Sequence, residues 1–264
     1  MCEVREGIPF GKMHFEKNEK GEQHLLTDVL PEKITGKQLK LRIEGADGKK
    51  IEYPVFEQNA YNYGIYSEYM KRHGCACCSL TTLLSAFCPE HKNLRPEETI
   101  SRVEKECFPE QEWKKNYKKH IARQMPVSLY GISKILMRYG IAHRYIGSFQ
   151  DEEAYEDIKN HLLRGKPVVI ETSRMKRKNG KIVKFFDKRF AGSYHTMILL
   201  GIDKNGQSVF TDSAYREWSG NRQRLKWATL EDLIDYMFAR KNGSDTHVYF
   251  SRRKNTGGYI LIDE

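Results

Sequence analysis

Three cysteines, Cys75, Cys77 and Cys78, lie within four positions of the chain. A cysteine attacks an acyl carbonyl when its side chain is present as the thiolate. Gly74 permits a sharp turn just before Cys75, and the apolar spacing that follows predicts a helix that begins at this point. The N–H groups and the dipole at a helix N-terminus favour the thiolate over the thiol. The sequence therefore indicates Cys75 as the candidate nucleophile of the three.

The candidate general base is His195, which opens the most apolar segment of the chain, HTMILLGI. Two predicted strands, residues 194–203 and 207–214, are joined by a Lys-Asn-Gly turn that is typical of a hairpin. Counted from this turn in both directions, His195 and Asp212 fall near the same end of the hairpin. A carboxylate at that end can hold the second ring N–H of the imidazole and fix its tautomer. The hairpin thus predicts a His–Asp pair that serves the thiol.

Gln58, in the segment YPVFEQNAY, is the fourth candidate. Its side-chain amide can donate a hydrogen bond to an oxyanion that develops beside Cys75, and the backbone N–H of Cys75 would be the second donor. A glutamine in a loop is usually only solvated. The assignment of Gln58 therefore depends on the other three residues.

The elements that must position these residues follow a simple order. Residues 40–56 are predicted to be two strands around an Asp-Gly turn, and the Cys75 helix is expected to end before Pro89. A block of helices is followed by strands that form an antiparallel sheet, which predicts an α+β fold. We expect an N-terminal extension, partly β, at 1–50 and one domain at 51–264. Further helices are expected at 95–108, 112–125, 128–140, 151–165 and 229–240, the last capped by Thr229, and further strands at 166–173 and in the two segments THVYFSRR and GGYILIDE at the end of the chain.

The chain carries a net charge of +10, with 45 Lys and Arg against 35 Asp and Glu. Such a charge can attract nucleic acid, anionic lipid or an acidic polymer. The densest basic run, residues 174–184, has Asn-Gly at its centre and is interpreted as a solvated hairpin, with a nucleic-acid patch as the alternative. Because no zinc-finger spacing and no ribonucleoprotein motif accompany this run, no nucleic-acid partner is expected.

The distribution of apolar residues bears on the compartment. No apolar run approaches the roughly 18 residues that a membrane span needs. The first residues also lack the apolar stretch of a secretory signal. We therefore expect a cytoplasmic protein without a membrane span, or a secreted one if a signal has been removed, and six cysteines that are free thiols. The sequence makes no prediction of the oligomeric state.

The order Gln58, Cys75, His195, Asp212 resembles that of the papain-like cysteine peptidases. In particular it is similar to the bacterial branch of double-glycine leader (bacteriocin-processing) peptidases, through the motifs PVFEQNAYNYG, HGCACCSLTTLL, RGKPVVIETS and GSYHTMILLGIDKNGQSVFTDSA. The likeness covers about residues 51–240. It implies a papain-like fold in which a helical subdomain with the Cys helix packs on an antiparallel sheet with His and Asp. It also implies a peptide or amide substrate, a thioester intermediate and no cofactor.

Two departures from the pattern of this branch concern the surroundings of the four residues. Ala76 and Cys77 stand where the relatives have Gly-Pro, and Ser213 stands where Pro commonly follows the Asp. Neither departure removes a candidate catalytic side chain. Both affect the shape of the pocket beside Cys75.

Three alternatives remain open at this stage. The set His73, Cys75, Cys77 and Cys78 offers soft ligands for zinc or copper(I), although Cys77 would point away from the others on a helix. The same thiol site can pass the acyl group to an amine, as phytochelatin synthase-like transferases do. A binding module that keeps the fold without catalysis is the third alternative.

Overall fold

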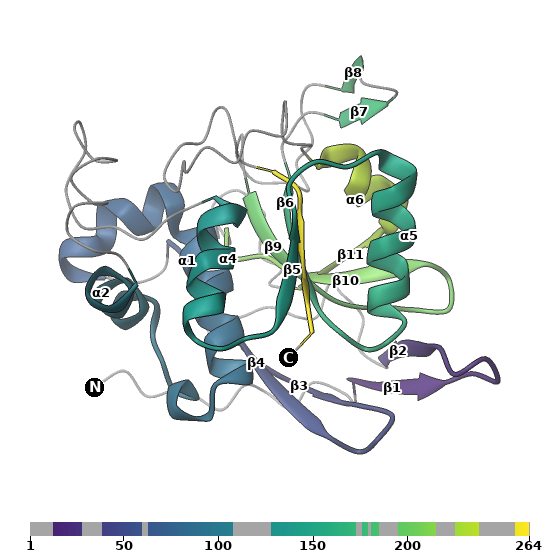
Figure 1. The fold of residues 1–264 in the computed structure, drawn as a ribbon, viewed down its shortest axis with the longest axis horizontal. Coiled ribbons are helices and arrows are strands. Elements are labelled where there is room, and N and C mark those ends of the chain that lie inside the picture. The colour runs from purple at the N-terminus through teal and green to yellow at the C-terminus, as the bar shows by residue number, and fades with distance from the viewer. Residues whose placement is uncertain are drawn as a thin grey trace.

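A six-stranded sheet forms the centre of the molecule (Figure 1). The computed structural model describes residues 13–27, 39–59, 63–107, 128–172, 176–178, 181–184, 195–214, 225–237 and 257–263. The strand order is β11-β10-β9-β6-β12-β5, and all neighbouring strands are antiparallel. The strands are β5 (His143–Ile146), β6 (Val168–Thr172), β9 (His195–Ile202), β10 (Gln207–Thr211), β11 (Leu225–Thr229) and β12 (Tyr259–Ile262).

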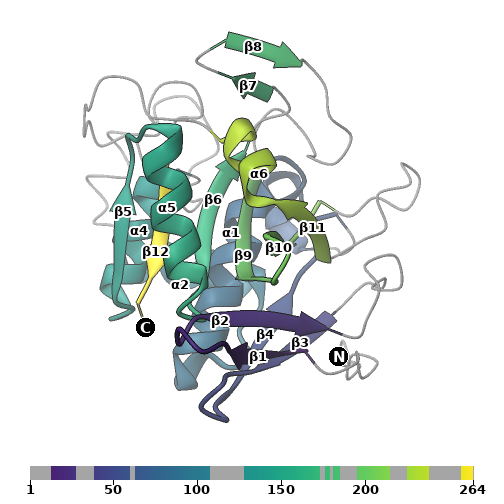
Figure 2. The same cartoon turned by 90° about the vertical axis from the view of Figure 1, so that its right-hand side faces the viewer.

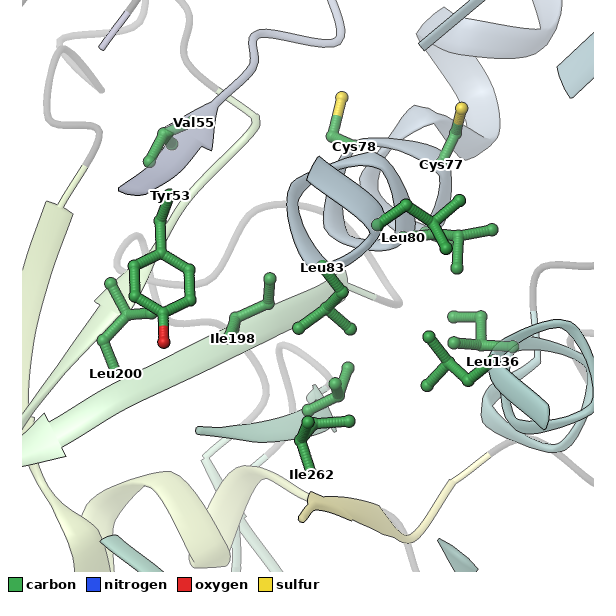
Figure 3. Close-up of a cluster of buried hydrophobic side chains, with 14 of the residues drawn as sticks. Tyr53, Val55, Cys77, Cys78, Leu80, Leu83, Leu136, Ile198, Leu200 and Ile262 are labelled. Carbon is green, nitrogen blue, oxygen red and sulfur yellow. The ribbon is translucent and has the colours of Figure 1, made fainter. Parts of the chain in front are cut away.

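Helices cover both faces of this sheet (Figure 2). Along β9, Ile198 and Leu200 pack into the core beneath α1, whereas Met197 and Leu199 pack into the core beneath α5. Figure 3 shows Ile198 beside Leu83 of α1. Burial on both faces explains why β9 is apolar at nearly every position. One face carries the helices α1 (Ser67–Phe87), α2 (Pro96–Glu106) and α4 (Leu129–Arg138). Two short 3-10 turns, η2 (Gly64–Tyr66) and η3 (Pro89–His91), lie at the two ends of α1. The other face carries α5 (Asp151–Leu162) and α6 (Leu230–Tyr236).

A smaller, four-stranded sheet supports one end of β9. At Gly201, a Cβ would lie 2.9 Å from the Phe15 ring and 3.0 Å from Leu25, so the missing side chain lets the small sheet approach β9 closely. The last strand of the small sheet also contacts α1, because the Thr82 hydroxyl donates to the carbonyl of Pro54. The chain leaves this strand three residues before Gln58. The small sheet has the order β2-β1-β3-β4 and consists of β1 (Met13–Lys17), β2 (Gln23–Thr27), β3 (Leu39–Glu44) and β4 (Lys50–Val55).

Most of the predicted elements are present. The strands around the turn at Gly48 are β3 and β4, and the strands joined at Gly206 are β9 and β10; both glycines have positive φ. Thr229 caps α6 as predicted, since its hydroxyl accepts from the N–H of Asp232 at 3.2 Å. The basic run forms a pair of strands, β7 (Lys176–Lys178) and β8 (Lys181–Lys184). The α+β prediction is confirmed, and the predicted helix 112–125 and the strand THVYFSRR lie outside the described residues.

One boundary prediction is wrong. The helix that carries Cys75 begins at Ser67, eight residues before the cysteine. Nothing in 67–73 stops a helix, and Gly74 is not at positive φ, so it does not form an entry turn. Its lack of a side chain serves another purpose, because a Cβ on Gly74 would lie 2.6 Å from the Cβ of Gln58. The glycine therefore permits close packing of the Gln58 loop against the helix.

Beyond the extension at 1–50, which was predicted only as partly β, two strands were not predicted. The segment of β5, HRYI, carries few apolar residues, and the segment of β11 contains a lysine between two apolar residues. β5 depends on a neighbour that is distant in sequence, since it pairs with the last strand β12, whereas β11 pairs with β10, the strand before it in the chain. Within the described part of the chain, no helix has both the length and the apolar character that crossing a membrane requires.

Candidate active site

Cys75 lies on the side of α1 that packs against the start of β9. Its side chain is buried, with 2% exposed. The sulfur is 4.0 Å from the hydroxyl of Thr196, and its interaction with His195 lowers the pKa of the thiol. One turn along the helix, the hydroxyl of Ser79 donates to the carbonyl of Thr196 at 3.4 Å. Contacts from two successive turns therefore fix this face of α1 on the first residues of β9.

His195 is paired with Asp212 at the opposite side of its ring from the thiol. The Nε2 atom of His195 is 2.9 Å from Oδ1 of Asp212. The same oxygen accepts the backbone N–H of Ala214 at 2.8 Å, which fixes the carboxylate at the end of β10. Because Nε2 is engaged by Asp212, the nitrogen that remains for Cys75 is Nδ1. The structure thus brings together three of the four residues that the sequence indicated.

A one-residue shift in the β9–β10 register is what aligns His195 with Asp212. Val209 pairs with Gly201, but the next residue of β10, Phe210, pairs with Leu199. If the shifted register is continued along the hairpin, Asp212 lies beside Met197. Met197 and His195 are two residues apart on β9, so their side chains point to the same face of the sheet. Without the shift, Asp212 would stand beside Ile198 and face the other side of the sheet. The position of the turn predicts that His195 and Asp212 lie near the same end of the hairpin, but it does not predict this bulge.

The buried charges favour a thiolate–imidazolium pair. Burial acts against the ionised form of Cys75, but the hydrogen bond and the positive charge of His195 outweigh it and lower the pKa of the thiol. Burial likewise disfavours the imidazolium, but the Asp212 carboxylate raises the pKa of His195 to about 9, with a further contribution from Cys75. For Asp212, Lys226 and His195 overcome the effect of burial and hold the pKa well below its usual range. Opposite shifts in neighbouring groups are typical of an acid–base site.

A comparison with known protein families agrees with this arrangement. The family model for the Peptidase C39-like family matches residues 50–242, well over half of the chain. The chain belongs to this family. The predicted relationship to papain-like cysteine peptidases, and to the bacteriocin-processing C39 peptidases among them, is therefore confirmed. No curated protein sequence gives a significant match.

In this C39-like chain, Gln58 lies against the turn of α1 that leads to Cys75. Its Nε2 atom is 3.5 Å from the carbonyl oxygen of Lys71, and its side chain is 6% exposed. The carbonyl of Lys71 is also the one to which the N–H of Cys75 donates in a regular helix. That N–H is therefore already used, and the expectation that it would serve as an oxyanion donor is not supported by the structure. Of the two expected oxyanion donors, the Gln58 amide therefore remains.

Ser213 sets the orientation of that amide. Its hydroxyl donates to Oε1 of Gln58 at 3.1 Å, and the backbone N–H of Gln58 donates to the carbonyl of Ser213 at 2.9 Å. With Oε1 held by a donor, the NH2 group is the end directed at α1. A proline at this position would have no hydroxyl to do this. The departure at Ser213 thus has a structural role, which sequence reasoning did not assign.

Lys226 is the charged residue that sequence reasoning missed. It lies on β11 opposite Phe210 of β10, is 7% exposed, and its ammonium group contacts Oδ2 of Asp212. The available signal was a lysine between Leu225 and Trp227 in an otherwise apolar segment. A lysine is rarely buried unless it is paired, so such a position indicates a buried partner.

The other two cysteines of the cluster are part of the hydrophobic core (Figure 3). Cys77 faces α2, where its thiol donates to the carbonyl of Pro96 at 3.3 Å, and burial raises its pKa. Cys75 and Cys77 therefore lie on different sides of α1. Among the described residues, no three His, Cys, Asp or Glu side chains gather where they could hold a metal ion.

Proposed function

We propose that this C39-like protein hydrolyses amide bonds in peptides, with Cys75 as nucleophile, His195 as acid and base, and Asp212 as the group that orients His195. The observation that supports this most strongly is the buried His195–Asp212 hydrogen bond, together with the lowering of the pKa of Cys75 by His195. Membership in a cysteine peptidase family supports a peptide as the substrate class. The three residues occur along the chain in the order Cys75, His195, Asp212, and their side chains lie in the same order in the structure.

The first half of the reaction is acylation. The Cys75 thiolate attacks the amide carbonyl, a C–S bond forms, and the carbonyl electron pair moves to oxygen. As the tetrahedral intermediate collapses, the C–N bond breaks and the His195 imidazolium gives its proton to the leaving amine. Asp212 holds Nε2, so that Nδ1 is the atom that exchanges this proton. The products of this half are a free amine and a thioester on Cys75.

The second half is hydrolysis of the thioester. His195 is now neutral and accepts a proton from water, whose oxygen attacks the thioester carbonyl. The C–S bond breaks, the carboxylic acid leaves, and the thiolate–imidazolium pair is restored. In both halves the Gln58 amide donates to the oxyanion, and Ser213 keeps the amide in the required orientation.

The nucleophile assignment is tested by alkylation. The full chain is treated with iodoacetamide at pH 5.5, where ordinary thiols react slowly, and the modified cysteine is identified by mass spectrometry. We expect modification at Cys75 in the wild type and none in Cys75→Ala. Cys77→Ala is the matched control and should be modified at Cys75 as fast as the wild type. Undiminished labelling in Cys75→Ala would show that another cysteine is the reactive one.

The reaction type is tested with a mixture of synthetic peptides in water enriched in oxygen-18. Hydrolysis places the heavy oxygen in the new C-terminal carboxylates, and Cys75→Ala should give none. Transfer to an added amine would instead give ligated products without the label. Ligated products as the main outcome would replace the hydrolase proposal by an acyltransferase on the same site.

A further inference from the structure

A lysine is buried on the far side of the triad carboxylate from the histidine. Lys226 of β11 contacts Oδ2 of Asp212, while Oδ1 accepts from His195 at 2.9 Å and from the N–H of Ala214 at 2.8 Å. Asp212 is fully buried, at 0% exposed, and Lys226 is 7% exposed. Both oxygens of the carboxylate therefore have a donor. The lysine is placed by strand pairing, since it stands opposite Phe210 on the neighbouring strand.

The four side chains form a row of alternating charge. From α1 to β11 the order is Cys75 thiolate, His195 imidazolium, Asp212 carboxylate and Lys226 ammonium, so the buried row is neutral as a whole. If His195 loses its proton to a leaving amine, Asp212 still has a cationic partner. Without Lys226, the same step would take both of these positive charges away from the buried carboxylate, which is strongly unfavourable.

We propose that Lys226 is a positioning residue that acts through Asp212: it holds Oδ2 and neutralises the carboxylate, so that His195 is able to release its proton during acylation. The inference rests on the proposed function of Cys75 and His195 and extends it to the strand β11. The Asp212 carboxylate supports the proposal, because Lys226 and His195 together outweigh burial and lower its pKa. Two further acids of the described residues are buried: Glu171 of β6 stands opposite Thr196, next to His195, and Glu57 directly precedes Gln58, whose backbone N–H donates to Ser213.

The direction of the effect follows from the charges. Removing a positive charge from the neighbourhood of Asp212 leaves His195 as its partner, and the carboxylate then holds the imidazolium more firmly. The midpoint of His195 should therefore rise, by about one pH unit, which is the lower end of what a charge at this range produces. A mere loss of structure would have the opposite effect, because a released histidine returns toward its ordinary pKa.

The test is a titration of the His195 ring by NMR in the full chain. The Cys75→Ala background removes the coupled thiol, and the signal is identified by its loss in His195→Gln. Lys226→Met removes the charge at similar length, Lys226→Gln keeps a hydrogen-bond donor without the charge, and Lys226→Arg keeps the charge. We expect an upward shift of about one pH unit in the Met and Gln variants and a shift of less than about 0.3 in the Arg variant.

An unchanged or lowered midpoint in Lys226→Gln would overturn the proposal, as would an equal shift in Lys226→Arg. If Lys226→Met does not fold, the Gln and Arg variants still decide between the outcomes. A failure of the proposed function is distinguishable, because it would appear as a lack of Cys75 alkylation in the wild type at pH 5.5, before any change at Lys226. With Cys75 intact, hydrolysis by Lys226→Gln should be about tenfold slower and restored by Lys226→Arg.

Discussion

The two sides of helix α1 place chemically identical thiols in opposite environments. Cys75 faces the start of β9, where His195 lowers its pKa although it is buried. Cys77 is two residues further on, faces α2 and is equally buried, but its pKa is raised by burial. Neither cysteine lies in the first turn of the helix.

The difference shows what lowers the pKa of the Cys75 thiol. The sequence pattern predicts that a helix N-terminus favours the Cys75 thiolate, but the dipole effect is confined to the first turn and α1 begins eight residues before Cys75. The cause that remains is the His195 ring, which lies more than 100 residues later in the chain and is supported by Asp212 of the same hairpin and by Lys226 of the neighbouring strand β11. The side of the helix, and not its end, decides which thiol has the lowered pKa.

Removal of His195 should have the largest effect on the difference between the Cys75 and Cys77 thiols. In His195→Ala, Cys75 should behave as an ordinary buried thiol, and hydrolysis should fall about 10⁴-fold or more. Alkylation at pH 5.5 should fall with it and recover only at alkaline pH. Both rates are measured on the full chain, with Cys77→Ala as control. Rapid labelling of Cys75 at pH 5.5 without His195 would contradict the assignment.

Asp212→Asn tests whether the partner of the histidine matters as much as the histidine itself. The amide keeps the size of the side chain but removes the charge that stabilises the imidazolium, so hydrolysis should fall about 10³-fold. The steady-state rate with a cleaved peptide is the measurement. A loss smaller than about tenfold would show that the buried pair is structural.

Gln58→Ala tests the oxyanion donor. We expect a loss of about 100-fold in kcat with little change in KM, because the donor acts on charge that develops in the transition state. Ser213→Ala should give a smaller loss, since the amide is then free to rotate but still present. A rise in KM without a change in kcat would assign Gln58 to substrate binding instead.

The pH profile separates the two titrating groups. Hydrolysis should rise with the Cys75 thiolate, below the ordinary thiol range, since the pKa of Cys75 is lowered. The raised pKa of His195 keeps the imidazolium through neutral pH, and the proton is lost as the pH rises through about 9. Hydrolysis should then fall about tenfold per pH unit, whereas alkylation, which needs only the thiolate, should stay high. A parallel fall in both rates would contradict this assignment.

Cys77→Ala is the smallest expected effect on activity. The substitution removes a buried sulfur that packs against α2, so the protein should lose about 1–2 kcal/mol of stability in urea unfolding. Hydrolysis and labelling of Cys75 should remain within about twofold of the wild type. A large loss of activity with a normal stability would show that the two sides of the helix are coupled.

The sequence predicted much of the candidate site. The apolar run that starts at His195 and the turn at Gly206 fixed a hairpin with a histidine and an aspartate at one end, because both signals are local. The α+β class followed from the same kind of local pattern. The start of α1 was not predictable, because Gly74 is compatible with a helix or with a turn, and the contact with Gln58 that explains it comes from another part of the chain.

By itself, the sequence determined which side chains were available for thiol chemistry and in which elements most of them lie. The tertiary structure decided which of them meet. A bulge turns Asp212 to the side of His195, strand pairing brings Lys226 beneath the carboxylate, and packing of α1 on β9 presents Cys75 instead of Cys77. The physical reason is that spacing along a chain specifies periodicity, whereas register and packing depend on contacts between distant segments.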